Sequence, residues 1–456
     1  MSGFEFGSLE PQHREDQIAE ALARVAEGEI RIVDLQFSDI SGGMKALTIP
    51  ANLLEYTFHH GYRFDGAALT GGERQVELDL YLAPDPGTLL IAPTRDGAIR
   101  RAQFFCWVLR RDGQAFAGDP RSALESQLRK AAELGFDYRV GAEMEFYLLK
   151  GRQTDNTLLP SADAAGYFDI GEDVLSETRD EIVASLQAMG VGVGGAHHET
   201  GPGQQELDLS HAGGIRIADQ ITTTRQVIRS IAQRRGLRAT FMAKPFSDAP
   251  GSGMHLFQRL LRYPDGDDLL RDPGSADGLT TTARHFIGGQ LAHAQGLSAI
   301  ACTTVNSYKR LADGHRAPRH ATWARVSQAS LIRVPGASPD QLADIELRSP
   351  DAMANPYLLI AATLGTAMTG IRHGEEPPVP VDENLVAYDD DELNRLGVPR
   401  LPSTLGEALD ALAADDTVRN AIGPYIFDQL LTVKRAEWDE YRRHVSPWEH
   451  LRYGDL

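Results

Sequence analysis

Two glutamates stand two positions apart in a segment that otherwise reads as a strand with apolar neighbours. The segment YRVGAEMEFYLL, residues 138–149, carries Glu143 and Glu145. Because side chains alternate across a strand, both carboxylates point to the same face. Two like charges on one face destabilise a sheet unless a cation joins them. A fold for this chain must therefore bring positive charge to that face.

Three further clusters of acidic and histidine residues lie on segments that read as strands. They are HHE at 197–199 with Glu206 and Asp208, GSGMH ending at His255, and DIELR with Glu346 and Arg348. Any one of these pairs alone is best explained as a solvated strand face, but four in one chain indicate a shared site. Glutamate oxygens with one or two histidines suit Mg²⁺ or Mn²⁺ better than zinc. Divalent ions held by carboxylates commonly contact the phosphates of a nucleotide.

Composition restricts the partners and the location of the chain. A length of 456 residues suits two to four domains or one large domain with an annex. A hydrophobic content of 42% is enough for a packed core. A net charge of −19 argues against binding to nucleic acid or to anionic membranes. Cys106 and Cys302 are too few and too far apart for a disulfide framework or a cysteine zinc site, so we expect a cytoplasmic protein. The N-terminus lacks an apolar signal region, and the longest apolar stretch, 357–371, is too short to span a membrane.

Periodic patterns predict a sheet-rich N-terminal region followed by mixed strands and helices. Strands are expected at 30–37, 79–84, 88–93, 102–110 and 138–149, and helices at 14–27, 178–189, 215–236, 279–294, 355–371 and 416–444. Asp119 and Pro120 are a typical N-cap and first residue of a helix that reaches Leu134. The acidic, proline-rich segment 373–404 is expected to be a long surface loop. The predicted class is α+β, with a small N-terminal and a large C-terminal domain.

A series of long motifs runs over nearly the whole chain. They are, in order, VDLQFSDISGGMKALTIP, FDGAALTGGERQVELDLYLAPD, AEMEF, HHETGPGQQE, ATFMAKPFSDAPGSGMH, NSYKRL, IRVP, IELRSPDAMANPY and EWDEYRRHVSPWEHLRY. These motifs resemble the glutamine synthetase family in its short bacterial form. The resemblance implies a β-grasp-like N-terminal domain, residues 1–110, and a catalytic domain, residues 111–456, with an antiparallel sheet and surrounding helices. It also implies that six subunits form a ring, that two rings stack into a dodecamer, and that neighbours share each site.

The resemblance implies a two-step reaction. ATP phosphorylates the side-chain carboxylate of glutamate, and an amine then displaces the phosphate. Two or more Mg²⁺ or Mn²⁺ ions per site are implied, and all six ligand positions are present. Glu145, Glu199 and Glu206 match the ligands of one ion, and Glu143, His255 and Glu346 match those of the other.

Further positions match residues that contact the substrates in the family. Arg310 and Arg348 match the arginines for the substrate carboxylate, and their guanidinium groups suit two-point contacts with such anions. Arg333 matches an arginine on the phosphate side. Asp65 matches an aspartate that helps to hold ammonium from the neighbouring subunit, and Gly251 matches a glycine whose backbone approaches the amino acid. The implied amino-acid site also includes the ion ligands Glu145 and His255.

The chain departs from the family pattern where the amine would react. The family places a glutamate over the ammonium site to take its proton, but here the loop reads ADGHRAP and Arg316 stands at that position. A cation there should repel ammonium and removes the expected base. Gln328 replaces an arginine that stabilises the transferred phosphoryl group, and Pro250 replaces an asparagine that contacts the substrate. The resemblance therefore makes Arg316 and Gln328 catalytic positions with altered side chains.

The implied nucleotide pocket also differs from the family pattern. GMHLFQR puts Phe257 and Arg259 where the family has histidine and serine. Gly194 stands where a glutamate contacts the nucleotide, His211 stands near the stacking aromatic, and Asp344 stands near an arginine. The nucleotide-binding positions implied for this chain are His211, Phe257, Arg259, Arg333 and Asp344.

Three functions are consistent with these residues. The preferred hypothesis is an ATP-dependent ligase that joins glutamate, or a related carboxylate, to an amine other than ammonia, with Arg316 contacting an anionic group on a larger nucleophile. The second is an ordinary glutamine synthetase, which would need another base. The third is a weak or inactive ring with a structural or regulatory role, favoured by Gln328 but opposed by the six retained ion ligands.

Overall fold

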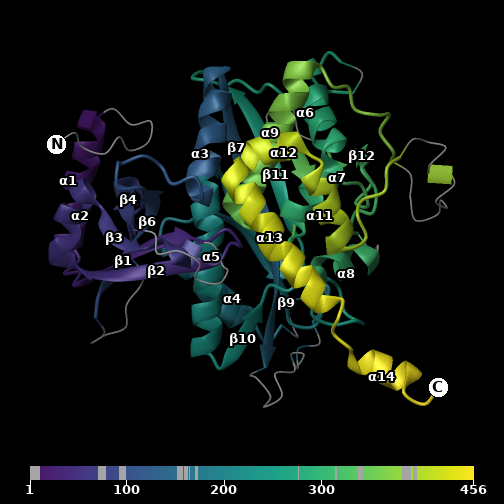
Figure 1. Cartoon of the computed structure of the whole chain (residues 1–456), viewed down its shortest axis with the longest axis horizontal. Coiled ribbons are helices and arrows are strands. Elements are labelled where there is room, and N and C mark those ends of the chain that lie inside the picture. The colour runs from purple at the N-terminus through teal and green to yellow at the C-terminus, as the bar shows by residue number, and fades with distance from the viewer. Residues whose placement is uncertain are drawn as a thin grey trace.

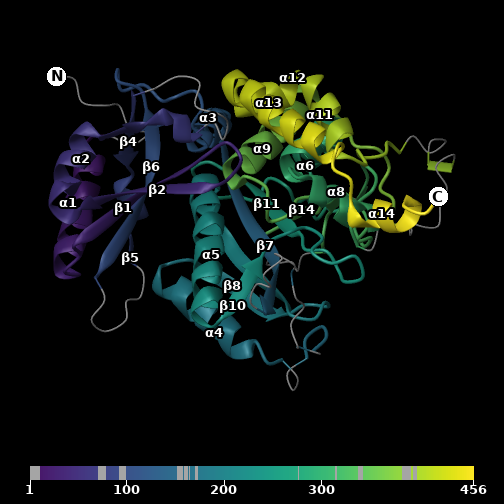
Figure 2. The same cartoon turned by 60° about the horizontal axis from the view of Figure 1, so that its bottom comes forward.

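The chain is described by a computed structural model that shows two adjoining domains (Figure 1). The described residues are 11–69, 79–91, 99–150, 158, 163, 165–169, 173–275, 277–313, 316–336, 342–382, 392–393 and 398–456. The N-terminal domain, purple to blue, stands beside a larger domain that carries the rest of the chain. The turned view keeps the same separation of the two domains (Figure 2).

The N-terminal domain is one mixed sheet covered by helices. Its elements are α1 (Pro11–Glu27), β1 (Ile32–Ser38), β2 (Met44–Pro50), α2 (Leu54–His60), β3 (Tyr62–Asp65), β4 (Asp79–Pro84), β5 (Leu90–Ile91) and β6 (Arg101–Leu109). The described strands follow the order β2-β1-β6-β4-β3, and β5 pairs with β6. The β1–β6 pair is parallel. Helix α1 buries Ile18, Ala21 and Val25 against this sheet, at the spacing that predicted a helix.

The larger domain is built around a second sheet. Its strands are β7 (Phe136–Lys150), β8 (Val193–His198), β9 (Gln204–Gly213), β10 (Leu237–Thr240), β11 (Met254–Arg262), β12 (Trp323–Ala324), β13 (Ile332–Arg333) and β14 (Ile345–Leu347). The described order is β12-β13-β14-β11-β7-β9-β8, and β10 pairs with β7. These pairs are antiparallel except the short β12–β13 pair, which is parallel.

Helices pack on the sheet of the larger domain and form its main core. They are α3 (Pro120–Glu133), α4 (Ser176–Ala188), α5 (Gly214–Arg234), α6 (Thr281–Ala292), α7 (Ala294–Ala301), α8 (Val305–Asp313), α9 (Pro356–His373), α11 (Leu405–Ala413), α12 (Asp416–Ile422), α13 (Pro424–Tyr441) and α14 (Pro447–Tyr453). Helix α9 is buried along most of its length. The helix expected at 355–371 is therefore confirmed, and α9 is buried. No described helix has the length and hydropathy that crossing a membrane requires.

Local sequence signals account for where several helices begin and end. The side chain of Asp119 accepts hydrogen bonds from the backbone N–H groups of Arg121 and Ser122, and Pro120 is the first helical residue of α3, as predicted. The prediction of a single helix over 416–444 is wrong, because the chain forms two helices there, α12 and α13. Gly423 has a φ of 86° and Pro424 follows it, so the helix cannot continue through this pair. Of the expected loop 373–404, residues 383–391 and 394–397 lie outside the described residues.

The C-terminal segment extends away from the body of the domain. Helix α14 lies beyond the end of α13 in both views (Figures 1 and 2). Its apolar side chains face solvent: Trp448 is 61% exposed, Leu451 89% and Tyr453 54%.

Candidate active site

The register of the second sheet aligns the acidic residues in two cross-strand rows. In one row, Glu143 on β7 lies opposite His255 on β11 and Asp208 on β9. In the next row, Glu145 lies opposite Glu206. Because each row contributes side chains to one face, the alternation of β7 places the carboxylates together, as its sequence predicts.

A cavity of about 310 Å³ opens over these rows. Its lining includes the predicted ion ligands Glu143, Glu145, Glu199, Glu206 and His255 and the predicted substrate or catalytic residues Gly251, Arg310, Arg316, Gln328, Arg333 and Arg348. Glu346 is buried beside it, with its Oε1 atom 3.5 Å from His255 Nδ1. Thus segments as far apart as β7 and the loop after α8 meet at one place.

Burial and mutual repulsion perturb the carboxylates of this cavity. Burial, together with the charges of Glu206 and Glu346, raises the pKa of Glu143 to about 8. Burial and the charge of Glu206 raise the pKa of Glu145 to about 7. Carboxylates that resist ionisation in this way lack a sufficient counter-charge, and a divalent cation would supply it.

The second predicted group of ion ligands is compact. Ligand atoms of Glu143, His255 and Glu346 all lie within 4.8 Å of one another. Burial and the neighbouring arginines, Arg348 first, hold the pKa of His255 well below its usual value, so the ring is neutral and can coordinate. The donor set therefore fits Mg²⁺ or Mn²⁺. Glu145, Glu199 and Glu206 line the same cavity, but the described chain does not bring them into so tight a group.

Two arginines contact Glu346, Arg333 on β13 and Arg348 directly after β14. Arg333 Nε lies 3.1 Å from Glu346 Oε2, and Arg348 Nη1 donates to Glu346 Oε1. Arg348 Nε also donates to the backbone oxygen of Gln328, at 2.9 Å. Glu346, a predicted ligand of the second ion, therefore holds Arg333 and Arg348 in place at the cavity.

Arg310 lines the cavity while backbone carbonyls hold its guanidinium group. Its Nη1 atom donates to the carbonyls of Ser349 and Pro350, at 2.8 and 3.2 Å, and its Nη2 atom donates to that of Arg348. A Cβ atom added to Gly251 would come within 2.8 Å of the Arg310 side chain, so glycine is needed for this approach. Two of the predicted substrate-binding residues therefore form one packed unit at the cavity wall.

Arg316 stands at the mouth of the cavity. It is exposed and has a φ of 57°, and its side chain lines the opening with Gln328 and Tyr167. Tyr167 is a lining residue that the sequence analysis missed, because it follows a segment without motif or clear periodicity. Its phenol has a raised pKa because of burial and the charges of Glu199 and Glu206, while the charge of Arg316 opposes that shift. Asp208, noted in the sequence but given no role, forms a further compact group with Glu143 and Glu206.

Of the residues assigned to the nucleotide, Arg333 lines the cavity, whereas three others form a separate polar cluster outside its lining. Asp344 accepts hydrogen bonds from Arg259 Nε and Nη2, both at 2.9 Å, and its Oδ1 atom lies 2.8 Å from His211 Nε2. Burial opposes ionisation of Asp344, but these two partners outweigh it and lower its pKa. Phe257 lies on β11 between Gly141 and Glu346 of the neighbouring strands. The three polar residues therefore satisfy one another's charge.

Two predicted positions lie apart from these clusters. Asp65 ends β3 in the N-terminal domain, where it is exposed and accepts a hydrogen bond from the backbone of Ala67. It is not among the residues that line the cavity. Gly194 is exposed on β8.

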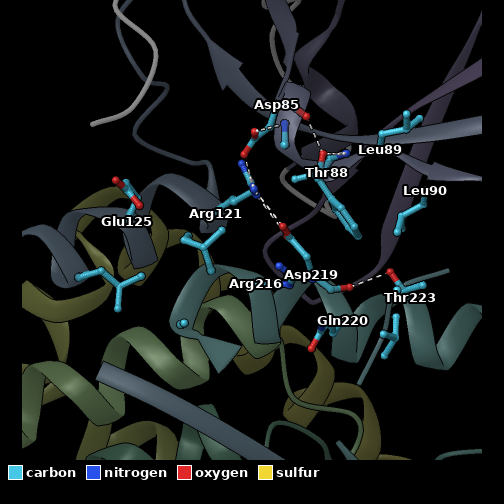
Figure 3. Close-up of a pocket in the computed structure, with 18 of the residues that line it drawn as sticks. Asp85, Thr88, Leu89, Leu90, Arg121, Glu125, Arg216, Asp219, Gln220 and Thr223 are labelled. Atoms are coloured by element: carbon cyan, nitrogen blue, oxygen red, sulfur yellow. Dashed lines mark hydrogen bonds and ion pairs between the residues drawn. The ribbon is translucent and has the colours of Figure 1, made fainter. Parts of the chain in front are cut away.

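A second and larger cavity, about 1010 Å³, lies at the seam between the two domains (Figure 3). Arg121, only 3% exposed, bridges Asp85 of the N-terminal domain and Asp219 of α5, with Nη2–oxygen distances of 2.8 and 2.9 Å. Tyr357 donates a further hydrogen bond to Asp219, at 2.6 Å. Burial opposes the charge of Arg121, but the two aspartates outweigh it and raise its pKa. This seam cavity carries none of the compact acid and histidine groups found among the described residues.

Sequence comparison identifies both domains. A family profile described as "Glutamine synthetase, beta-Grasp domain" matches residues 29–111, and one described as "Glutamine synthetase, catalytic domain" matches residues 117–453. The chain belongs to the glutamine synthetase family. This confirms the resemblance, the α+β class and the pairing of a β-grasp domain with a large catalytic domain.

Relatives of this family cover nearly the full length of the chain. A glutamine synthetase of Halobacterium salinarum is 38% identical over 426 residues, which are 93% of each chain. A glutamine synthetase of Mycolicibacterium smegmatis is 38% identical over 95% of this chain and 98% of its own length. A solved complex of GmaS with ADP is 29% identical, with a TM-score of 0.85 over 96% of this chain and 99% of GmaS. At this level the chain is a glutamine synthetase-like, ATP-dependent C–N ligase.

Proposed function

We propose that this protein is an ATP-dependent ligase that joins glutamate, or a related carboxylate, to an amine other than ammonia through an acyl phosphate. One observation carries the proposal: the cation Arg316 lines the mouth of a cavity that otherwise keeps the acidic ligand set of the family. The amine part of the site is altered, while the ion part is not.

Two groups of residues would hold divalent ions, Mg²⁺ or Mn²⁺. Glu145, Glu199 and Glu206 would hold one ion, and Glu143, His255 and Glu346 the other. Such ions neutralise the charge on transferring phosphate groups. The raised pKa values of Glu143 and Glu145 support this role, because the folded chain keeps both groups without a matching positive charge.

The cavity wall would bind the acid substrate and the phosphate. Arg348 and Arg310, which line the cavity with Gly251, would contact the amino acid, and Arg333 would contact the phosphate. Arg348 and Arg333 both contact Glu346, so occupation of the ion group by metal would free part of their charge for an anionic substrate. Gln328 at the mouth supplies an uncharged hydrogen-bonding group in place of an arginine.

The mouth of the cavity would select the amine. Arg316 disfavours a small cation such as ammonium and favours a nucleophile that carries an anionic group. Tyr167 presents an aromatic ring, 48% exposed, beside it. An amine larger than ammonia fits this combination of charge and ring.

ATP would occupy the cluster of Arg259, Asp344 and His211 with Phe257. The similarity to a GmaS complex with ADP supports a nucleotide site in this chain. Asp65 would act in a neighbouring subunit, which requires self-association.

We also propose that six subunits form a ring and that two rings pair into a dodecamer. Within each subunit, we propose a domain boundary between residues 110 and 111. The exposed apolar residues of α14 support contacts between subunits. Light scattering should give a mass near that of twelve subunits for the full chain, and a smaller particle after removal of residues 446–456. An unchanged mass for the shortened chain would exclude α14 as an assembly element.

The test of the proposed function is ADP release with glutamate, ATP, Mg²⁺ and a panel of amines that includes ammonia. We expect turnover with at least one larger amine, and little with ammonia. Arg316→Glu should raise kcat/KM for ammonia by about tenfold or more and lower it for the preferred amine. Arg325→Glu, an exposed arginine outside the cavity lining, is the matched control and should change neither value. Absence of ADP release with every amine would reject the proposal.

An ordinary glutamine synthetase is the second candidate. Its support is that curated relatives at 38% identity carry that name. It predicts that ammonia is the preferred nucleophile of the unaltered chain and that Arg316→Glu brings no gain with ammonia.

A further inference from the structure

A buried hydrogen-bonded pair lies directly behind the ion site. His198 is 1% exposed and Asp163 is 4% exposed. His198 Nε2 lies 2.7 Å from Asp163 Oδ2, and His198 Nδ1 lies 2.5 Å from the backbone oxygen of Glu199. The pair therefore contacts the backbone of a proposed ion ligand rather than its carboxylate.

The two partners of the His198 ring determine where its hydrogens lie. A backbone carbonyl can only accept, so Nδ1 must carry a hydrogen that it donates to Glu199. Nε2 then either donates to the Asp163 carboxylate or accepts from the protonated acid. Asp163 is thus the partner that holds the second nitrogen of the ring while Nδ1 contacts Glu199.

Glu199 needs such a support because it lies just beyond the end of a strand. The β8–β9 ladder ends at the pair His198 and Gln205. The N–H group of Glu199 donates to the carbonyl of Gln204, at 2.9 Å, and the His198 ring engages its carbonyl. Both backbone groups of Glu199 are therefore fixed, although strand pairing no longer sets its position.

Asp163 also shapes the segment that reaches the cavity mouth. Its Oδ1 atom accepts a hydrogen bond from the backbone of Ala165, at 3.1 Å, and the backbone N–H of Phe168 donates to the carbonyl of His198, at 3.2 Å. Between these two anchors lies Tyr167, whose ring centroid is 5.3 Å from that of His197. One carboxylate thus supports both Glu199 and Tyr167.

We infer that Asp163 and His198 are positioning residues that set Glu199 for ion binding and Tyr167 for amine binding. The inference rests on the proposed function, because it takes Glu199 as an ion ligand and Tyr167 as part of the amine site. A group behind a metal ligand typically changes metal affinity by about 10–100-fold when it is removed. The pair should therefore act on affinity rather than on the chemical step.

The test is Mn²⁺ binding to the full-length oligomer, measured by calorimetry for the unaltered chain and for Asp163→Ala. This substitution removes the oxygen that faces His198 Nε2 and the oxygen that accepts from the backbone of Ala165. We expect the Mn²⁺ dissociation constant of one class of sites to rise about 10–100-fold, and that of the other class to change less than about threefold. The KM of the amine should rise, while kcat at saturating Mn²⁺ should stay within about threefold.

Two further variants separate positioning from a general loss of structure. His198→Asn can still donate to the Glu199 carbonyl but cannot reach Asp163, so its effect on Mn²⁺ should be smaller than that of His198→Ala. Asp415→Ala removes a carboxylate from a comparable pair, in which His293 Nδ1 lies 2.9 Å from Asp415 Oδ2, at helix ends away from the cavity. It should leave Mn²⁺ binding unchanged.

The outcomes distinguish this inference from the proposed function. Equal Mn²⁺ affinities for Asp163→Ala, Asp415→Ala and the unaltered chain would overturn the inference and leave the ligase proposal intact. Weakened binding in Asp163→Ala, with no turnover of any amine by the unaltered chain, would support the positioning pair and reject the ligase. An unaltered chain that binds no Mn²⁺ would overturn both.

Discussion

Arg121 and Glu143 both line cavities of this protein, but the surroundings of Arg121 stabilise its charged form and those of Glu143 destabilise it. At the domain seam, Arg121 lies between Asp85 and Asp219, and these partners outweigh the cost of burial. In the smaller cavity, Glu143 faces further carboxylates, and its pKa rises to about 8. In the larger cavity the buried cation is paired with two carboxylates, whereas in the smaller one Glu143 faces like charges.

The difference separates a structural use of charge from a functional one. The seam network joins Asp85 of the N-terminal domain to α3 and α5 of the catalytic domain, so its charges hold two domains together. The acids over β7 oppose folding unless a cation arrives, and a protein retains such a cost where function needs it. Changes in the two cavities should therefore move stability and activity separately.

The largest expected effect is the loss of activity in Glu145→Gln. The variant removes a proposed ion ligand and should reduce turnover by about a thousandfold or more. Its melting temperature without metal should not fall, because the change removes one of several repelling carboxylates. Glu125→Gln in the seam cavity is the matched control and should keep full activity. Unchanged turnover in Glu145→Gln would refute the ion assignment.

The next effect is on stability, in Arg121→Met. Methionine leaves Asp85 and Asp219 without their shared cation in a buried place, which should cost about 3–5 kcal/mol of unfolding free energy. Urea unfolding followed by circular dichroism measures it. Arg129→Met, an exposed residue of the same helix and the same cavity, should change stability by less than about 0.5 kcal/mol. Equal losses in the two variants would show that the seam network does not hold the domains together.

The smallest effect is a pH dependence that belongs to the active-site cavity. Burial and the neighbouring carboxylates raise the pKa of Glu143 from the ordinary glutamate value of 4.5 to about 8 in the folded chain. The folded state therefore binds more protons than the unfolded state between these values, and stability should fall as the pH rises through this window, by about 1–3 kcal/mol. Between pH 5.5 and pH 8, the melting temperature of the metal-free, unaltered chain should therefore fall more than that of metal-free Glu143→Gln. Mg²⁺ should remove that extra dependence, and a variant with the same pH profile as the unaltered chain would contradict this account.

Local patterns predicted the parts of the fold that depend on local chemistry. The alternation around Glu143 and Glu145 indicated their shared face, and the pair Asp119 and Pro120 indicated the start of α3. The break at Gly423 and Pro424 was equally visible in the sequence, but the apolar periodicity on both sides was given too much weight. The motifs and their order predicted the family and both domains.

Contacts between distant segments were out of reach for such reasoning. Tyr167 reaches the cavity through hydrogen bonds of its segment to Asp163 and to His198, and neither spacing nor periodicity encodes them. The attachment of Arg310 to the backbone of residues 348–350 likewise depends on how α8 meets β14. A sequence indicates candidate residues, but only the folded sheet shows which of them line the same cavity.

The central claim is that the altered cavity mouth selects an amine other than ammonia. The most direct measurement is mass spectrometry of the products after incubation with glutamate, ATP and Mg²⁺ in an equimolar mixture of ammonium and larger amines, including amines with an anionic group. The account predicts a γ-glutamyl amide of a larger amine as the main product, with glutamine as a minor one. Glutamine as the main product would contradict it.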